Sequence, residues 1–212
     1  MKEFNTKAVL PVIHVESLDQ AIRNINTCIS AGADGCFLIN HVISREELIT
    51  IAKECRRIFP DSWLGINELS VRTVDDLGDL LFLDGLWTDQ AFNLFDKFQY
   101  DGLYFGGVAF KYQPIEKDLK GACEAAITSM NVITTSGPST GCAPEIKKIR
   151  EMREYLGSHI LAIASGLDLV NVVDYIYDAD IFMLSSSICK NDENIDLTAL
   201  EAFISTVRRY SE

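Results

Sequence analysis

The stretch VITTSGPSTG (Val132–Gly141) runs from a short apolar strand into glycine and small hydroxyl residues, and LAIASG (Leu161–Gly166) and IFMLSSS (Ile181–Ser187) repeat that plan. Glycine lets a backbone N–H approach an anion closely, and Ser and Thr add hydroxyl donors. In an eight-stranded βα barrel the last such loops form the usual phosphate site. The three stretches therefore predict a phosphate cradle, although Gly and Ser also favour ordinary turns and helix caps.

The rest of the chain alternates apolar strands with helical patterns. Strands are predicted at Ala8–Val15, Gly35–Asn40, Trp63–Asn67, Gly85–Thr88, Leu103–Val108, Asn131–Thr135, Ile160–Ser165 and Ile181–Ser186. Helices are predicted between the cap Ser17 and Gly32, between Ser44 and Pro60, and near Val74–Leu81, Phe92–Phe98, Lys117–Ser129, Ala143–Tyr155, Val170–Ile176 and Leu197–Tyr210. Eight such units favour a single-domain (β/α)8 TIM barrel over residues 1–212, and a doubly wound open sheet is the structural competitor.

The charge of the chain excludes one class of partner. Its formal net charge is -12 and its pI is near 4.7, whereas a nucleic-acid footprint needs clustered Lys and Arg. No apolar run approaches the roughly 20 residues of a membrane span. The first run, Ala8–Ile13, also has no basic leader before it. We therefore expect a cytoplasmic protein that binds neither nucleic acid nor membrane.

The six cysteines lie far apart and form no C-x-x-C pair. This spacing indicates reduced thiols rather than a zinc cluster or a disulfide framework. Cys28, Cys55 and Cys123 fall within helical patterns, where cysteine acts as a small hydrophobe. None of the six is expected to be a nucleophile, because no histidine is adjacent in sequence.

Function in such a barrel gathers where the strands end. The polar residues and glycines at the predicted strand ends are His14, Asn40, His41, Asn67, Glu68, Thr88, Asp89, Gly106, Gly107, Lys111, Thr135, Ser136, Gly137, Thr140, Gly141, Ser165, Gly166, Ser185, Ser186, Ser187 and Lys190. We expect the catalytic groups to be Asp89, Glu68, His14 and Lys111. Substrate or phosphate is expected at Asn40, His41, Asn67, Gly107, Thr135, Ser136, Gly137, Thr140, Gly141, Ser165, Gly166, Ser185, Ser186 and Lys190.

The candidate catalytic residues each have a second interpretation. Glu68 and Asp89 could divide into a general acid and a general base, or hold a divalent cation, although no cofactor is otherwise predicted. Each could instead cap a helix or form an ion pair with a basic residue such as Arg72. His14 lies on an apolar strand, where a buried structural histidine is common. Lys111 could neutralise substrate charge or act as an amine nucleophile, or lie over its aromatic neighbours.

The chain also resembles the BtpA family of barrel proteins. TTSGPSTG (Thr134–Gly141) resembles V-T-G-x-x-T-G, AIASGLDLVNV (Ala162–Val172) resembles G-S-G-V-x-x-x-N, and ADIFMLSSSICKND (Ala179–Asp192) resembles A-D-G-x-I-V-G-T-x-x-K. PVIHV (Pro11–Val15), GADGCFLINH (Gly32–His41) and LWTDQAF (Leu86–Phe92) match more loosely, and the order holds over nearly the whole chain.

The resemblance implies a phosphate-binding (β/α)8 barrel, and some relatives are regarded as nucleosidases or phosphoribosyl enzymes. It carries over Asn40, Asp89, Gln90, Thr140, Gly141, Ser165, Gly166, Asn171 and Lys190. The chain departs from the family at Ile39, where a glutamate is frequent, and at Ser185–Ser186, where Gly-Thr is usual. Ile39 weakens a metal or acid role at that position. Ser185 replaces the close approach of a ligand to the backbone, which glycine allows, with a hydroxyl group.

These observations predict an enzyme acting on a small phosphorylated metabolite, with a lyase, isomerase or nucleosidase reaction left open. A phosphoribosyltransferase would normally carry two acidic residues followed by a Gly/Thr-rich loop, and neither Asp75–Asp76 nor Asp178–Asp180 has that sequel. Such an activity would need another architecture. The rival hypothesis is a metabolite-binding barrel without catalysis that acts in assembly or regulation, and the protein could form a homo-oligomer.

Overall fold

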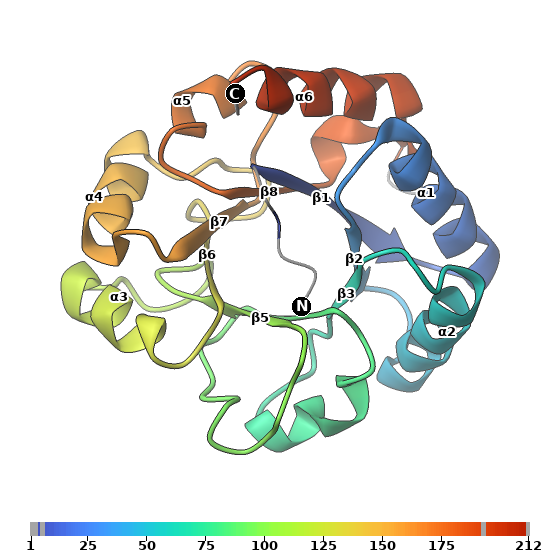
Figure 1. Cartoon of the computed structure of the whole chain (residues 1–212), viewed down its shortest axis with the longest axis horizontal. Helices are drawn as coiled ribbons and strands as arrows, with labels where there is room; N and C mark the ends of the chain where they lie inside the picture. The colour runs from blue at the N-terminus through green and yellow to red at the C-terminus, as the bar shows by residue number, and fades with distance from the viewer. Residues whose placement is uncertain (1–3, 5–6, 192–193, 211–212) are drawn as a thin grey trace.

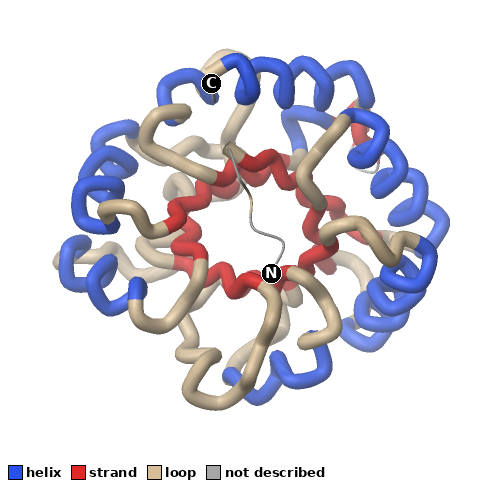
Figure 2. The backbone as a smooth tube through the Cα atoms, viewed as in Figure 1, coloured by secondary structure: helices blue, strands red, loops and turns tan. Residues whose placement is uncertain are grey.

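Eight parallel strands form a closed barrel in which each strand pairs with its neighbours in sequence and β8 pairs with β1. The computed structural model describes residues 4, 7–191 and 194–210. Figures 1 and 2 show the strands as an inner ring surrounded by the helices. The strands are β1 (Ala8–Val15), β2 (Cys36–Asn40), β3 (Leu64–Asn67), β4 (Gly85–Thr88), β5 (Leu103–Gly107), β6 (Val132–Thr135), β7 (Ile160–Ala164) and β8 (Ile181–Leu184). The predicted (β/α)8 barrel is confirmed.

The helices follow the predicted order with different lengths. They are α1 (Leu18–Ala31), α2 (Arg45–Ile58), the 3-10 helix η1 (Val74–Leu80), α3 (Leu119–Ile127), α4 (Ile146–Leu156), α5 (Val172–Tyr175), the 3-10 helix η2 (Ser186–Ile188) and α6 (Leu197–Arg209). The predicted caps are present, because Ser17 accepts the Gln20 N–H and Ser44 forms a capping box with Glu47. Gly32 ends α1 with a φ of 78°.

The predicted helix at Phe92–Phe98 is wrong. This segment makes only one helical turn, in which the Leu94 carbonyl accepts from the N–H groups of Lys97 and Phe98. The first residue of the segment is bonded to β5, because the Phe92 N–H donates to the Tyr104 hydroxyl at 2.9 Å. The sector between β4 and β5 is therefore loop, as the lower part of Figure 2 shows.

Two further expectations need correction. Helix α4 begins at Ile146, so Pro144 lies before the helix rather than in its first turn, and its carbonyl accepts the Tyr175 hydroxyl at 2.6 Å. The sequence reasoning also missed a small antiparallel pair after the barrel, β9 (Cys189–Asn191) and β10 (Asn194–Ile195). Asp192, the last residue of the stretch that resembles the BtpA family, lies outside the described residues.

The interior of the barrel is filled rather than open. Inward positions of successive strands place Phe37, Trp63, Trp87 and Phe105 together, with ring centroids 5.0 to 6.1 Å apart. A second apolar layer lies between the outer faces of the strands and the helices. Burial of these two layers is the main favourable contribution to folding. The filled interior limits a ligand to the ends of the barrel.

Four side chains close the N-terminal end of the barrel, and we call them the basal acceptors: Asp34, Asp84, Asn131 and Asp180. Each precedes an even-numbered strand and accepts a backbone N–H from the strand before it, at 2.7 to 2.9 Å. The donors are Val9, Leu64, Tyr104 and Leu161. Because strand pairing leaves these N–H groups at the edge without partners, the basal acceptors satisfy them.

Arginines from three helices reinforce the aspartates among the basal acceptors. Arg208 of α6 pairs with Asp34 at 2.6 Å, Arg56 of α2 pairs with Asp84, and Arg153 of α4 pairs with Asp180. The fourth acceptor, Asn131, is a neutral amide and cannot form an ion pair. It joins β5 and β6, and this pair of strands borders the loop that replaces the predicted fourth helix.

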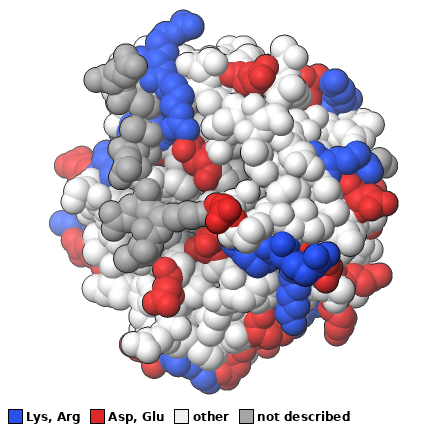
Figure 3. Space-filling view, turned by 45° about the vertical axis from the view of Figure 1, so that its right-hand side comes forward, with Lys and Arg blue, Asp and Glu red and all other residues white. Residues whose placement is uncertain are grey.

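The surface carries acidic and basic groups side by side. On the face drawn in Figure 3, Lys and Arg side chains are interspersed with Asp and Glu side chains. Such mixing, with the net charge of -12, does not match the clustered basic surface that nucleic acid requires. Within the described part of the chain, no helix has both the length and the apolar character needed to cross a membrane.

Candidate functional site

A cavity of about 350 Å³ opens at the C-terminal ends of the strands, and we call it the mouth. Its floor is apolar and comes from inward residues of the barrel, among them Val12, Ile39 and Met183. Its walls carry two histidines, one lysine and a run of hydroxyl groups and glycines. The predicted site residues that line it are His14, His41, Lys111, Thr140, Gly141, Ser165, Gly166, Ser185 and Ser186.

The remaining predicted site residues do not line the mouth. Ser136 and Gly137 line a second cavity of about 500 Å³ beside it. Lys190 lies in the β9–β10 hairpin, where its ammonium is 3.6 Å from the Asp196 carboxylate. The residues behind the mouth or at its base are Asn40, Asn67, Glu68, Asp89, Gly107 and Thr135, and most of them are buried.

The two histidines form a pair on one side of the mouth. The ring centroids of His14 and His41 are 4.6 Å apart and the rings are tilted by 48°. Burial lowers the pKa of His41, the nearby Lys111 ammonium lowers it further, and Asp89 opposes this by raising it. The imidazole of His41 is therefore neutral at pH 7 and can accept or donate a proton.

The loop that carries Lys111 has an unusual backbone. Ala109 and Tyr112 have φ values of 47° and 63°, in the left-handed region that non-glycine residues rarely adopt. The Lys111 N–H donates to the Ser136 hydroxyl at 2.8 Å, which ties this loop to the loop after β6. The Lys111 ammonium lies 5.5 Å from the centroid of the Phe110 ring. Strained backbone of this kind is concentrated at functional sites.

The loops after β6 and β7 join at Ser165. Its hydroxyl accepts the Gly141 N–H at 2.9 Å, and its φ of 82° is again left-handed. The next residue, Gly166, has its carbonyl held by the Asn171 amide at 2.7 Å. Asn171 is one of the residues that the BtpA resemblance carries over, and here it supports the loop from behind. The loop after β8 adds Ser185, Ser186 and Ser187 to the same wall.

Gly137 and Gly166 are needed for close packing of backbone. A Cβ on Gly166 would lie 2.1 Å from the Ala143 nitrogen, and one on Gly137 would lie 2.1 Å from the Cys142 carbonyl oxygen. The segment Cys142–Ala143 therefore rests directly on both glycines. Gly141 differs, because a Cβ there would meet open space, although its φ is 78°.

Glu68 is enclosed by partners. It is 2% exposed, and its carboxylate lies 3.3 Å from the Arg45 guanidinium and 3.3 Å from the Asn40 amide. It also accepts the N–H and the hydroxyl of Ser70 at 2.9 and 2.8 Å. The pairing with a basic residue thus exists, but the partner is Arg45 rather than Arg72. With both oxygens engaged, Glu68 is placed to hold the base of the site.

Asp89 is more accessible than Glu68. Its Oδ1 accepts the Asn67 amide at 3.0 Å, and its backbone carbonyl accepts the Gln113 amide at 2.7 Å. The negative charge of Asp89 acts on His41, whose pKa it raises. In the described part of the chain, no group of three or more His, Cys, Asp or Glu residues could hold a metal ion. A divalent cation shared by Asp89 and Glu68 stays a prediction.

Trp87 and Asp168 line the mouth but were not predicted from the sequence. Ser187, which was named as a strand-end residue but not as a binding residue, lines it as well. The indole of Trp87 is an inward residue just before Thr88, so strand alternation could have found it. Asp168 accepts the N–H groups of Val170 and Asn171 at 2.8 and 2.9 Å, a turn that its position two residues after Gly166 could have suggested.

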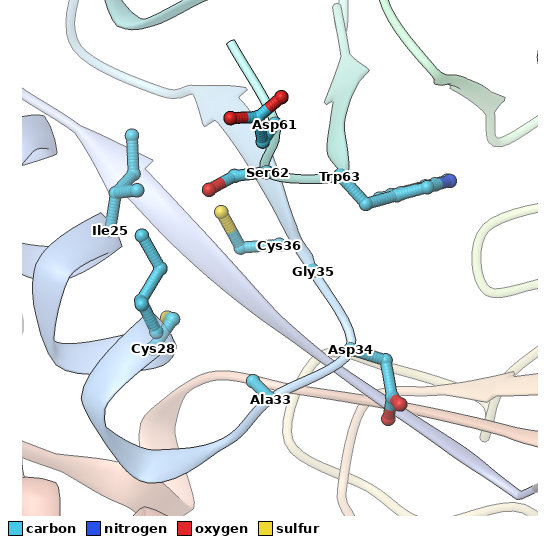
Figure 4. A pocket seen from close by; sticks show the side chains of 10 residues that line it. Ile25, Cys28, Ala33, Asp34, Gly35, Cys36, Asp61, Ser62 and Trp63 are labelled. Carbon is cyan, nitrogen blue, oxygen red and sulfur yellow. The ribbon is translucent and has the colours of Figure 1, made fainter. Parts of the chain in front are cut away.

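A further cavity of about 250 Å³ lies between α1 and the starts of β2 and β3, at the opposite end of the barrel. Figure 4 shows Cys28, Cys36, Asp61 and Ser62 around it, with the Asp34 carboxylate pointing away. A hydrogen bond with the Cys36 thiol, together with burial, raises the pKa of Cys28, so the Cys28 thiol stays protonated. This cavity offers no activated group, and the mouth is the better candidate site.

The chain was compared with known proteins. No protein-family model matches it, and no curated protein matches it by sequence. Among solved structures it is similar to native KDPGal, with a TM-score of 0.76 and 14% identity over 99% of this chain and 98% of that one. It is also similar to the KDPG aldolase of Legionella pneumophila with pyruvate captured as a covalent carbinolamine (TM-score 0.69, 14% identity, 97% and 95%). A third is the phosphoribosyl anthranilate isomerase of Thermus thermophilus (TM-score 0.64, 12% identity, 95% and 98%).

At such low identity these likenesses show the fold alone. They confirm the barrel that the resemblance to the BtpA family implied. Membership of that family is not shown and stays a prediction.

The charges around His41 give a prediction that needs no substrate. Lys111→Met should raise the pKa of His41, because it removes a nearby positive charge, and Asp89→Asn should lower it. Both changes are measured by an NMR titration of the histidine ring. Lys190→Met is the matched control, since Lys190 lies outside the mouth and its loss should leave the pKa unchanged. An unchanged pKa in both test variants would show that these groups do not face His41.

Proposed function

We propose that this barrel is an enzyme acting on a small phosphorylated metabolite, a sugar phosphate or a compound of phosphoribosyl or nucleoside type. The phosphate would bind the loops after β6, β7 and β8. The observation that carries the proposal is that one cavity joins the hydroxyl and glycine wall at Ser165, Gly166 and Ser186 to the histidine pair and Lys111. Its volume of about 350 Å³ suits a small ligand.

The two sides of the mouth have different chemistry. Backbone N–H groups and serine hydroxyls bind an anion without a full charge, which fits a phosphate held locally by an acidic protein. On the other side, a neutral His41 would exchange a proton with the substrate, and the charge of the Asp89 carboxylate, which does not line the mouth, would raise the pKa of that histidine. Lys111 can neutralise negative charge or react as an amine with a carbonyl carbon. Lyase, isomerase and N-glycoside cleavage reactions all fit this set.

Two comparisons support the proposal without deciding it. The solved barrels of similar shape include an aldolase with a covalent pyruvate carbinolamine and an isomerase of a phosphoribosyl compound. The BtpA family, which the chain resembles, consists of phosphate-binding barrels. We place the protein in the cytoplasm and allow for a homo-oligomer. A barrel that binds the same metabolite without turnover would share the anion site and would show no product.

The anion site is tested by calorimetric titration with phosphate and ribose 5-phosphate. Ser165→Ala and Ser186→Ala should each weaken binding about tenfold, because one hydrogen bond to a charged group contributes roughly 1.5 kcal/mol. Ser158→Ala is the control, since Ser158 is exposed in the turn before β7, at the other end of the barrel. Absence of binding to the wild type, or equal affinity in all three variants, would refute the phosphate site.

A further inference from the structure

The second cavity contains a lysine that the proposed mechanism does not use. Lys148 lies in the first turn of α4 and lines the cavity of about 500 Å³ beside the mouth. The opposite wall is formed by residues 109–116 of the loop after β5 and by Leu119 at the start of α3. Lys147, the preceding residue, also lines this cavity, but 82% of its side chain is exposed.

The Lys148 ammonium joins two loops of the site. It donates to the carbonyl oxygen of Ala109 in the loop after β5, and to that of Ser136 in the loop after β6 at 2.8 Å. Ala109 is one of the residues with a positive φ, and its carbonyl also accepts the Thr135 hydroxyl at 3.3 Å. The Ser136 hydroxyl in turn accepts the Lys111 N–H. A single cation thus bonds at two of the points that fix the Lys111 loop.

The position is unfavourable for a cation on two grounds. The first turn of a helix disfavours positive charge, because the helix dipole is positive at that end. Burial also favours the neutral amine and lowers the pKa of Lys148 to about 8, with Cys123 and Glu145 acting in the opposite direction. The acceptors that the structure gives to Lys148 are neutral carbonyl oxygens rather than a carboxylate.

We propose that Lys148 is a positioning residue that holds the strained Lys111 loop against the loop after β6, and so sets the distance between Lys111 and the anion wall of the mouth. This inference rests on the proposed function for its consequence, but not for its structural part. Protonated Lys148 keeps the loop in place, and loss of the proton weakens both carbonyl contacts because charged donors form the stronger hydrogen bonds.

Three variants separate this role from a simple loss of charge. Lys148→Met removes the donor and keeps an unbranched side chain, and Lys147→Met removes the same charge one residue earlier on the exposed face. Lys148→Arg keeps a cation that does not lose its proton in this pH range, and the adjoining cavity leaves room for it. Circular dichroism establishes that each variant is folded.

The first measurement is amide hydrogen exchange, which needs no ligand. Lys148→Met should exchange at least about tenfold faster than wild type over residues 109–113, since the local opening free energy falls by about 1.4 kcal/mol or more. Lys147→Met should match wild type, and Lys148→Arg should lie near it. Equal exchange in Lys148→Met and Lys147→Met would overturn the inference, whatever the protein binds.

The second measurement is the affinity for sulfate, whose charge does not change between pH 7 and 9.5. Wild type and Lys147→Met should lose affinity for sulfate as the pH rises through about 8. Lys148→Met should bind sulfate weakly at every pH in this range. Lys148→Arg should keep its affinity for sulfate as the pH rises. The charged and titratable groups around Lys148 are Tyr112, Glu116, Glu145 and Lys147 on the cavity wall, Glu151 further along α4, and Cys123 on α3.

The outcomes are distinguishable. A wild type that binds neither sulfate nor phosphate refutes the proposed function, and the exchange data then decide the positioning role alone. If wild type and Lys148→Met bind sulfate with the same dependence on pH, the positioning role of Lys148 is refuted and the proposed anion site stands. If Lys148→Met does not fold, the comparison of wild type with Lys148→Arg at pH 7 and 9.5 decides. Exchange of all amides accelerates with pH because it is base-catalysed, but only wild type should also lose protection over residues 109–113 relative to the intrinsic exchange rate at each pH.

Discussion

Gly166→Ala is expected to lower the free energy of unfolding by about 3 kcal/mol, and to remove the anion binding of the mouth. The added Cβ would lie 2.1 Å from the Ala143 nitrogen and 2.2 Å from the Cys142 carbonyl carbon. These are backbone atoms, so no side chain can turn away to make room. The φ of 72° adds strain for any residue with a side chain.

The matched control is Gly141→Ala, one loop earlier on the same wall. Gly141 has a φ of 78°, but a Cβ there meets nothing within 4 Å. The control therefore carries the backbone strain alone and should cost about 1 kcal/mol. Urea denaturation measures both variants. If the two losses of stability were equal, the contact between Gly166 and the segment Cys142–Ala143 would not contribute.

Asp180→Ala is expected to lower the free energy of unfolding by roughly 2 to 3 kcal/mol, with no direct effect on the mouth. The change leaves the Leu161 N–H without its acceptor and leaves the Arg153 guanidinium without its carboxylate. Removing one partner of a partly buried pair costs more than the pair itself contributes, because the other charge stays in place. Denaturation in guanidinium chloride measures the loss of stability, and the affinity for sulfate shows whether the mouth is unchanged.

Two comparisons refine that result. Asp180→Asn keeps an oxygen for the Leu161 N–H, as Asn131 does naturally for Tyr104, and should cost only about 1 kcal/mol. Asp178→Ala removes a neighbouring carboxylate whose partner, Arg150, is exposed, and should change stability by less than about 0.5 kcal/mol. A loss at Asp178 as large as that at Asp180 would mean that the basal position is not special.

The sequence was informative wherever local chemistry decides the structure. Buried strands with apolar residues on both faces predicted the barrel, and Ser17, Gly32 and the Ser44–Glu47 pair correctly bounded the first helices. It failed at Phe92–Phe98, where the structure keeps a single helical turn at residues 94–98 and the Phe92 N–H donates to the Tyr104 hydroxyl. A helical pattern of apolar residues contains no information about such contacts between distant parts of the chain.

In the candidate site, too, the positions set by local sequence were predictable and the contacts between distant residues were not. Strand ends predicted the wall at Ser165 and Ser186 and the position of His14, because all parallel strands end at the same face. The partner of Glu68 was not predictable, since Arg45 reaches it from α2 only after the barrel has closed. The role of Lys148 was likewise hidden, because the two carbonyl groups that it joins are 27 residues apart in sequence.

The basal acceptors hold the four pairs of barrel strands by different bonds. Three pairs are joined by an aspartate that is itself paired with an arginine, whereas β5 and β6 depend on the neutral Asn131 and border the loop between β4 and β5. Lys111 belongs to the loop that follows β5. The strands beneath Lys111 are therefore joined at their base without the ion pair that reinforces each of the other three basal acceptors.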